Sequence, residues 1–210
     1  LSSVIATFVG TLAALGLAKF KKKYTKSAVM TVTNIPMVNP EIVTAVSLVL
    51  LFSAIFTLFG LKINDFASLL IAHITFNLPY VILSVMPRVR QMDPSLTEAA
   101  MDLGCTPAKA FFKIELPQIM PGIFSGLIMA FTMSFDDFVI SHFTSGTIET
   151  LPLKIYSMTG KGSVTPDMYA LSTIVIVTVF VLLLISNLKS GKKLNLQLNK
   201  SKKRKGGIAK

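Results

Sequence analysis

The stretch from residue 67 to residue 86 reads ASLLIAHITFNLPYVILSVM and contains no Lys, Arg, Asp or Glu. About 20 such residues are what an α-helix needs to cross the hydrocarbon core of a bilayer. Four other stretches are similarly apolar, and two of them are interrupted by acidic residues. The sequence therefore predicts an all-α, polytopic transmembrane bundle over residues 1–188, with five spans present: 1–18, 28–55, 67–86, 121–143 and 168–188.

The composition agrees with a membrane protein. Hydrophobic residues make up 52% of the 210 residues, charged residues make up 15%, and the mean hydropathy is +0.66. Soluble domains carry about 25% charged residues. The single cysteine, Cys105, excludes a disulfide framework and a cysteine-rich metal site. We expect no bound metal.

Basic residues are distributed unevenly between the loops. Eighteen of the 21 Lys and Arg residues fall in the first connection, the third connection and the tail of residues 189–210. Because Lys and Arg concentrate in cytoplasmic loops, these three segments are predicted to be cytoplasmic, with Leu1 at the outer face of the cell membrane. The net charge of +11 then requires no nucleic acid partner. The basic tail is expected to be disordered and to contact anionic membrane lipids.

The chain begins at Leu1, inside an apolar run and without a Met. We interpret it as lacking upstream residues. An odd number of spans combined with a cytoplasmic tail leaves room for one further span on the N-terminal side.

The third connection, residues 88–119, is too polar to span a membrane and carries the signals of a helix and a turn. Ser95, with Glu98 three residues later, forms a capping-box pattern, which predicts the start of a helix. Gly104 predicts the end of that helix, because glycine readily adopts the left-handed conformation of helix C-termini.

A second short helix is expected after this turn. Pro107 suits a first helical turn, where its missing N–H has no partner to lose. The helix is predicted over residues 109–115 and is expected to stop before Pro117. The whole connection should therefore form a helix, a turn and a helix across the cytoplasmic face.

Three acids lie inside predicted spans: Glu41, Asp136 and Asp137. A charged side chain at the centre of a span costs about 2.5–3.5 kcal/mol on insertion scales, so such residues are expected to face a polar cavity or a partner. At 1.5 Å per residue, Glu41 and Asp136 lie about 20 and 22 Å from the cytoplasmic ends of their spans. Acids at one height, without Lys or Arg beside them, would suit an elongated cationic substrate.

A second interpretation places Asp136 and Asp137 at the outer interface, where they would cap a helix end. Adjacent residues point about 100° apart on a helix, so both cannot face a path equally. Glu41 follows Pro36 and Pro40, which are expected to break or kink its span. Broken helices inside a membrane often line substrate routes, because the freed backbone groups need polar surroundings.

Other polar and aromatic residues of the spans are weaker candidates. Phe76, Tyr80 and Phe138 could offer cation–π contacts to an amine, although packing is the commoner role of such rings. His73 and His142 could be ligands or proton carriers, but a hydrogen bond between helices is the favoured interpretation.

Small residues four positions apart indicate where helices approach closely. Gly122 with Gly126, and Ala6 with Gly10, have this spacing. Each pair predicts a face that packs against another helix.

The third connection also carries a longer pattern, with seven matched positions spread over twenty: Glu98, Ala99, Ala100, Gly104, Ile114, Leu116 and Pro117. This pattern resembles the EAA loop of ABC importer permeases. The resemblance implies that the short helix sits in a groove of an ATPase subunit and transmits its motion. An ordinary amphipathic loop helix is the alternative.

Further stretches resemble permeases of the spermidine/putrescine (PotC-like) type: residues 31–43, 70–76, 79–84, 134–141 and 151–157. The resemblance implies the type I permease fold of ABC importers, which usually has six spans, so that the first is missing here. It also implies a polyamine substrate, a second homologous permease, two ATPase subunits and an extracellular or periplasmic binding protein.

The chain itself is not expected to be an enzyme. It contains no G-x-x-x-x-G-K-[ST] phosphate-binding loop, so ATP is expected on the partner ATPase and no cofactor on this chain. Two alternatives remain. One is an ABC permease for another solute, such as thiamine, iron or an organophosphonate, and the other is an ion-driven transporter or channel, against which the EAA-like spacing argues.

Overall fold

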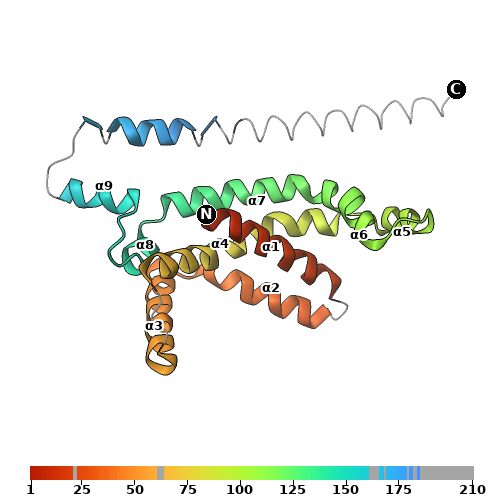
Figure 1. Cartoon of the computed structure of the whole chain (residues 1–210), viewed down its shortest axis with the longest axis horizontal. Coiled ribbons are helices and arrows are strands. Elements are labelled where there is room, and N and C mark those ends of the chain that lie inside the picture. Colours follow the sequence, from red (N-terminus) through yellow and green to blue (C-terminus); the bar gives the residue numbers. More distant parts are fainter. Residues whose placement is uncertain are drawn as a thin grey trace. The chain divides into compact units, whose positions relative to one another are not determined.

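The computed structural model describes residues 1–20, 23–60 and 64–160, and, further along, residues 166–167, 169–178, 180–181 and 184. All regular structure in these residues is helical. The helices are α1 (Ser2–Lys19), α2 (Lys23–Val38), α3 (Glu41–Phe59), α4 (Asp65–Arg90), α5 (Pro94–Asp102), α6 (Pro107–Ala110), the π-helical segment η1 (Phe111–Glu115), α7 (Leu116–Asp136), α8 (Val139–Thr144) and α9 (Leu151–Gly160) (Figure 1).

Four helical stretches of the described residues are long and apolar enough to cross a membrane: Ser2–Lys19, Glu41–Phe59, Asp65–Arg90 and Pro107–Asp136. The chain divides into two compact units at residues 164 and 165. In the second unit, Tyr169–Thr178 is a shorter apolar helix within the expected fifth span. The rest of that span lies mostly outside the described residues, and the basic tail of residues 189–210 lies wholly outside them.

The stretch 28–55, expected as one span, is divided between α2 and α3. The division falls at Asn39 and Pro40, and the carbonyl of Pro40 accepts the first backbone N–H groups of α3. Pro40 has no N–H to donate, and its ring disfavours the helical conformation at the preceding residue, Asn39. These two effects explain the break. Pro36, the other expected breaking point, lies inside α2. The apolar helix α3 then continues beyond the predicted end to Phe59.

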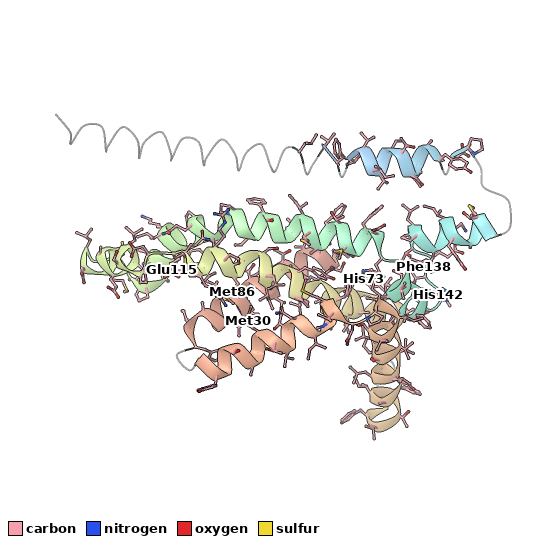
Figure 2. The ribbon with its side chains drawn as sticks, turned by 180° about the vertical axis from the view of Figure 1, so that it is seen from behind. Met30, His73, Met86, Glu115, Phe138 and His142 are labelled. Carbon is pink, nitrogen blue, oxygen red and sulfur yellow. The ribbon has the colours of Figure 1, made fainter. Side chains whose placement is uncertain are left out.

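Helices α1, α4 and α7 lie side by side and form the main core (Figure 1). The core residues are Ala14, Leu17, Val81, Ile82, Val85, Met86, Val89, Ile119 and Ala130. Met30 of α2 packs against this cluster from outside; both Met30 and Met86 are labelled in Figure 2. The cluster is aliphatic apart from Met86, with small Ala residues on α1 and α7 and larger side chains on α4.

The predicted small-residue faces are confirmed at this core. A Cβ on Gly122 would lie 2.8 Å from Cγ of Arg88 and 3.0 Å from the carbonyl oxygen of Ser84, on α4. A Cβ on Gly10 would lie 2.7 Å from Cγ1 of Val81. The shortest distance at each glycine is below what real Cβ atoms show, so neither position leaves room for a side chain. Helix α4 is therefore in close contact with α7 at Gly122 and with α1 at Gly10.

The expectation that the second loop helix stops before Pro117 is wrong. The helical chain runs from Pro107 through η1 into α7 without interruption. Pro117 cannot donate a hydrogen bond, and its ring crowds the carbonyl four residues earlier. The preceding turn is π-helical instead, with the N–H of Leu116 bonded to the carbonyl of Phe111, five residues back. A π-turn of this kind lets a helix pass a local disturbance and continue.

Candidate functional site

The helical hairpin, residues 93–110, begins at a cap that differs from the one expected. Asp93, and not Ser95, is the N-cap of α5, and its carboxylate accepts the N–H of Ser95 at 3.0 Å. Pro94 occupies the first helical position, where its ring is already set for a helix, and this moves the start of the helix before Ser95. Hydrogen bonding from the Ser95 side chain, and then from its backbone N–H, lowers the pKa of Asp93. The cap is therefore ionised near neutral pH and is lost only in acid.

Gly104 ends α5 as predicted. Its φ is +86°, in the left-handed region. The N–H of Gly104 bonds to the carbonyl of Met101 at 2.9 Å, and the N–H of Cys105 bonds to the carbonyl of Ala100 at 3.0 Å. These two bonds are the pair that defines a Schellman turn. No atom of the described residues lies within 4 Å of a Cβ built on Gly104, so the backbone conformation, and not crowding, requires glycine.

The outer face of this hairpin is open and partly apolar. Glu98 and Ala99 are exposed, while Ala100 is buried on the inner side. Leu103, at the turn, is 87% exposed, and Phe112 of η1 is 63% exposed. An exposed surface with large apolar side chains beside small ones is typical of a protein–protein contact.

The later positions of the EAA-like pattern join the hairpin to the core. Leu116 is half-buried and packs against the main core cluster. Ile114 is half-buried, and its carbonyl accepts a bond from the Gln118 side chain at 3.0 Å. Pro117 is exposed. A displacement of α6 would therefore reach α7 through one continuous helical segment.

At the other end of α7, the two adjacent acids have different surroundings. Asp136 is the last residue of α7 and is exposed. Asp137 is buried, and its carboxylate accepts the N–H of Ile140 at 3.2 Å and the N–H of Ser141 at 2.8 Å. Asp137 therefore bonds to the backbone at the start of α8, a role that the second interpretation allowed for these acids.

A polar junction surrounds this break, formed by Ser2, His73, Ser134, Asp137 and Ser141. Nδ1 of His73 lies 2.9 Å from Oγ of Ser134, and Nε2 lies 3.0 Å from Oγ of Ser141. Nε2 is also 3.5 Å from Oδ2 of Asp137, and Oγ of Ser134 is 2.8 Å from Oγ of Ser2. His73 therefore makes the hydrogen bonds between helices that were expected of it. Figure 2 labels His73 on α4, and Phe138 and His142 at the break and on α8.

Sequence reasoning missed the serines of this junction. Ser2, Ser134 and Ser141 lie in three different helices. Isolated serines are common in membrane helices, so no local pattern marks these three. Ser134 and Ser141 flank the two acids in the sequence, but this arrangement indicates a polar junction only once the structure shows that His73 contacts both serines.

The remaining predicted path residues gather where α3 meets α4. Phe76 is buried, and its ring lies 5.5 Å from that of Tyr80 in an edge-on arrangement. Glu41, the first residue of α3, is exposed and lies within electrostatic range of the Tyr80 hydroxyl. Phe76 belongs to a second core cluster, with Ala45, Leu48, Ala72 and Ile140. This cluster holds the start of α3 against α4 and α8.

Phe138 and His142 take part in ring contacts on the same side of the break. The ring of Phe138 lies 4.7 Å from that of Tyr156 on α9 and 5.6 Å from that of His142. The ring of His142 also contacts Phe143 edge-on. These contacts are packing interactions, which was the commoner role expected of Phe138. The side chain of His142 was expected to hydrogen-bond between helices, but among the described residues it makes ring contacts only.

This helical bundle, with an exposed hairpin on a continuous segment into the core, has the fold of ABC transporter membrane chains. It superposes on a chain of a solved structure described as a bacterial ABC transporter involved in the import of the acidic polysaccharide alginate, with a TM-score of 0.63 and 15% identity. That match covers 91% of this chain and 77% of the other. A chain of an amino acid ABC transporter matches with a TM-score of 0.56 and 19% identity, covering 89% of this chain and 86% of the other.

The family is shown by the sequence. Residues 6–189 match the model of the family described as "Binding-protein-dependent transport system inner membrane component", and the chain belongs to this family. It is 40% identical over 177 residues to the putrescine transport system permease protein PotI of Escherichia coli K12, covering 83% of this chain and 63% of PotI. It is 42% identical over 188 residues to the spermidine/putrescine transport system permease protein PotC of Haemophilus influenzae, covering 89% of this chain and 70% of PotC. The chain thus spans less than two thirds of the length of PotI.

Proposed function

We propose that this chain is a permease subunit of an ATP-driven importer of polyamines such as spermidine and putrescine. The names of the PotI and PotC relatives support this substrate class. The chain would form the translocation path together with a second, similar permease. It would receive the amine from an extracellular or periplasmic binding protein, and two ATPase subunits would drive it.

The helical hairpin is the single observation that carries the coupling part of this proposal. Its outer face presents Glu98 and Ala99 beside exposed apolar side chains, which is the chemistry of a contact with a protein groove. Gly104 sets the angle between α5 and α6 through a positive φ. Ile114, Leu116 and Pro117 continue the segment into α7, so a push on α5 has a mechanical route to the core.

In the proposed cycle, ATP binding closes the ATPase subunits against the hairpins of the two permeases. The displacement would open the path outward, where the amine enters from the binding protein, and hydrolysis would return the path inward. ATP would bind the partner alone, because the chain has no phosphate-binding loop in its sequence. The protein would be a multi-pass protein of the cell membrane, with its hairpin and C-terminal tail in the cytoplasm and the basic tail near anionic lipids.

The exposed carboxylates Glu41 and Asp136 are the proposed amine contacts of the path. Both are accessible in the described chain, so a cation can approach them without breaking existing bonds. Tyr80, half-buried beside Phe76, would add an aromatic face to the same region.

The experiment is uptake of labelled spermidine by cells that lack their own polyamine import and express the full-length subunit with its neighbouring ATPase, second permease and binding protein. Glu41→Gln and Asp136→Asn should each raise the apparent KM for uptake. Wild-type uptake in both variants would remove these acids from the path. Uptake of a different solute in place of polyamines would contradict the substrate class and leave the coupling proposal standing.

Retention of an ATPase provides a second test, independent of the substrate. The purified full-length subunit should retain the ATPase in a pull-down, and Gly104→Val should lose it. Full transport with no ATPase present would contradict the coupling role and favour an ion-driven transporter or channel.

A further inference from the structure

Two neighbouring carboxylates at the end of α7 do not have the same freedom to bind a cation. Asp136 is exposed, whereas the side chain of Asp137 is 2% exposed. Both oxygens of Asp137 are already in use: Oδ1 accepts the N–H of Ile140, and Oδ2 accepts the N–H of Ser141. The side chain is also almost fully enclosed, so an ammonium group could reach Asp137 only if the residues around it moved.

The imidazole of His73 completes the surroundings of this carboxylate. Nε2 lies 3.5 Å from Oδ2 of Asp137 and 3.0 Å from Oγ of Ser141. The backbone N–H of Ser141 is also one of the donors to Asp137. Nδ1 is held from the opposite side by Ser134, in the last turn of α7. One buried ring therefore joins α4 to the last turn of α7 and the first turn of α8.

The bonds of Asp137 also determine where α7 ends. Its backbone has a φ of −67° and a ψ of 114°, an extended conformation that stops the helix. Its side chain accepts N–H groups from the first turn of α8, which begins two residues later at Val139. Asp136 is therefore the last helical residue, and its direction depends on the break remaining at this position. A helix that ran on through residue 137 would turn both carboxylates to new directions about 100° apart.

We propose that Asp137 and His73 are a positioning pair, which holds the break between α7 and α8 so that Asp136 alone of the two acids is presented to the cation. The amine contact of Asp136 rests on the proposed function. The pair itself rests on the distances around His73 and Asp137 and is independent of which solute is carried.

The uptake test compares neighbouring, isosteric variants in the assembled full-length transporter. Asp136→Asn removes a charged contact to the amine, so the KM for spermidine should rise about tenfold or more, with Vmax little changed. Asp137→Asn keeps one oxygen that can accept a backbone N–H, so the KM should stay within about twofold of wild type. Asp137→Ala, which keeps no acceptor, should raise the KM, because the break that directs Asp136 toward the cation is no longer held. A KM increase in Asp137→Asn equal to that in Asp136→Asn would overturn the positioning role.

A stability test decides the same question without transport. His73→Leu and Asp137→Ala should each lower the melting temperature of the solubilised transporter, and the double variant should lose clearly less than the sum of the two single losses, because both changes break one set of bonds. His73→Leu combined with Asp136→Ala is the control and should be additive. Additive losses for His73 and Asp137 would overturn the pair. If wild-type protein moved no polyamine, the proposed function would fail. The melting temperatures of the single and double variants would then test the positioning pair by themselves.

Discussion

In the helical hairpin, the hydrogen bonds that shape the cap and the turn join residues at most five positions apart, such as Cys105 and Ala100. In the polar junction, the bonds between helices join residues that are 61, 68 and 132 positions apart. The hairpin is largely exposed, whereas the junction is buried at His73, Asp137 and Ser141 and half-buried at Ser2 and Ser134.

This difference suits what each region is proposed to do. A surface that a partner protein pushes must keep its shape while its surroundings change, and bonds between near neighbours allow that. The junction depends on how α4, α7 and α8 are placed, so a shift of α7 would be felt directly at His73 and Asp137. The geometry next to the proposed amine contact is therefore sensitive to helix packing, and the geometry of the proposed ATPase contact is not.

The largest effect is expected from separating α4 and α7. Gly122→Val would place a branched side chain where even a Cβ alone would lie 2.8 Å from Cγ of Arg88 and 3.0 Å from the carbonyl oxygen of Ser84. Overpacking of this kind costs about 1–3 kcal/mol. We expect a lower melting temperature and faster hydrogen exchange at the Ser141 amide, with the Cys105 amide unchanged.

Gly16→Val on α1 is the matched control for this experiment, because nothing lies within 4 Å of a Cβ at Gly16. It should change the melting temperature much less. Equal loss of protection at Ser141 and Cys105 in Gly122→Val would show that the two regions are not built independently.

A substitution at Gly104 should disturb the hairpin and leave the junction intact. A β-branched residue at a φ of +86° is strained by about 1–2 kcal/mol, so Gly104→Val should open the turn of the hairpin and reduce ATP-driven uptake. Hydrogen exchange at Ser141 should remain slow. Gly104→Asn is the control, since Asn tolerates the left-handed region, and it should retain more uptake than the Val variant. An equal loss of uptake in both variants would show that uptake does not depend on the left-handed backbone conformation at Gly104.

A buried amide near the junction sharpens the comparison. Asn77, one turn of α4 beyond His73, is fully buried, and neither its side-chain nitrogen nor its oxygen has a hydrogen-bond partner among the described residues. Replacing an unpartnered buried amide by an apolar side chain removes a desolvation cost, so Asn77→Leu should stabilise the protein by about 1 kcal/mol. Thermal melting of the solubilised protein measures this. A loss as large as that of His73→Leu would mean that Asn77 is bonded as tightly as the junction.

The smallest effect is expected at an exposed ion pair. Nζ of Lys154 lies 2.6 Å from Oε2 of Glu149, and both side chains are largely exposed. Exposed pairs contribute about 0–1 kcal/mol, so Glu149→Gln should leave the melting temperature and uptake close to wild type. A large loss of uptake would instead assign this pair to a contact with another chain.

Several features of the hairpin followed from the sequence, and the errors there were local ones. Gly104 was expected to end α5, and it does. The start was misplaced because Asp93 and Ser95 are both good caps, and only the position of Pro94 decides between them. The stop at Pro117 failed because a π-turn accommodates proline where a regular α-turn cannot.

At the junction, the chemistry was visible and the arrangement was not. A histidine in a span was expected to bond to another helix, yet its partners Ser134 and Ser141 carry no signal of their own. For Asp136 and Asp137, the sequence left two roles open: capping a helix end and lining the substrate path. Their separation into an exposed and a buried carboxylate follows from the contacts of α8 with α3 and α4, which no local pattern encodes.

The amino-acid sequence alone determined that this chain is a bundle of membrane helices with an exposed helix–turn–helix, because apolar length, glycine conformation and proline position act within a few residues. Only the tertiary structure decided which carboxylate is buried and which is free, and which serines hold His73. Those outcomes depend on side chains that lie far apart in the sequence and meet only once α1, α4 and α7 have packed.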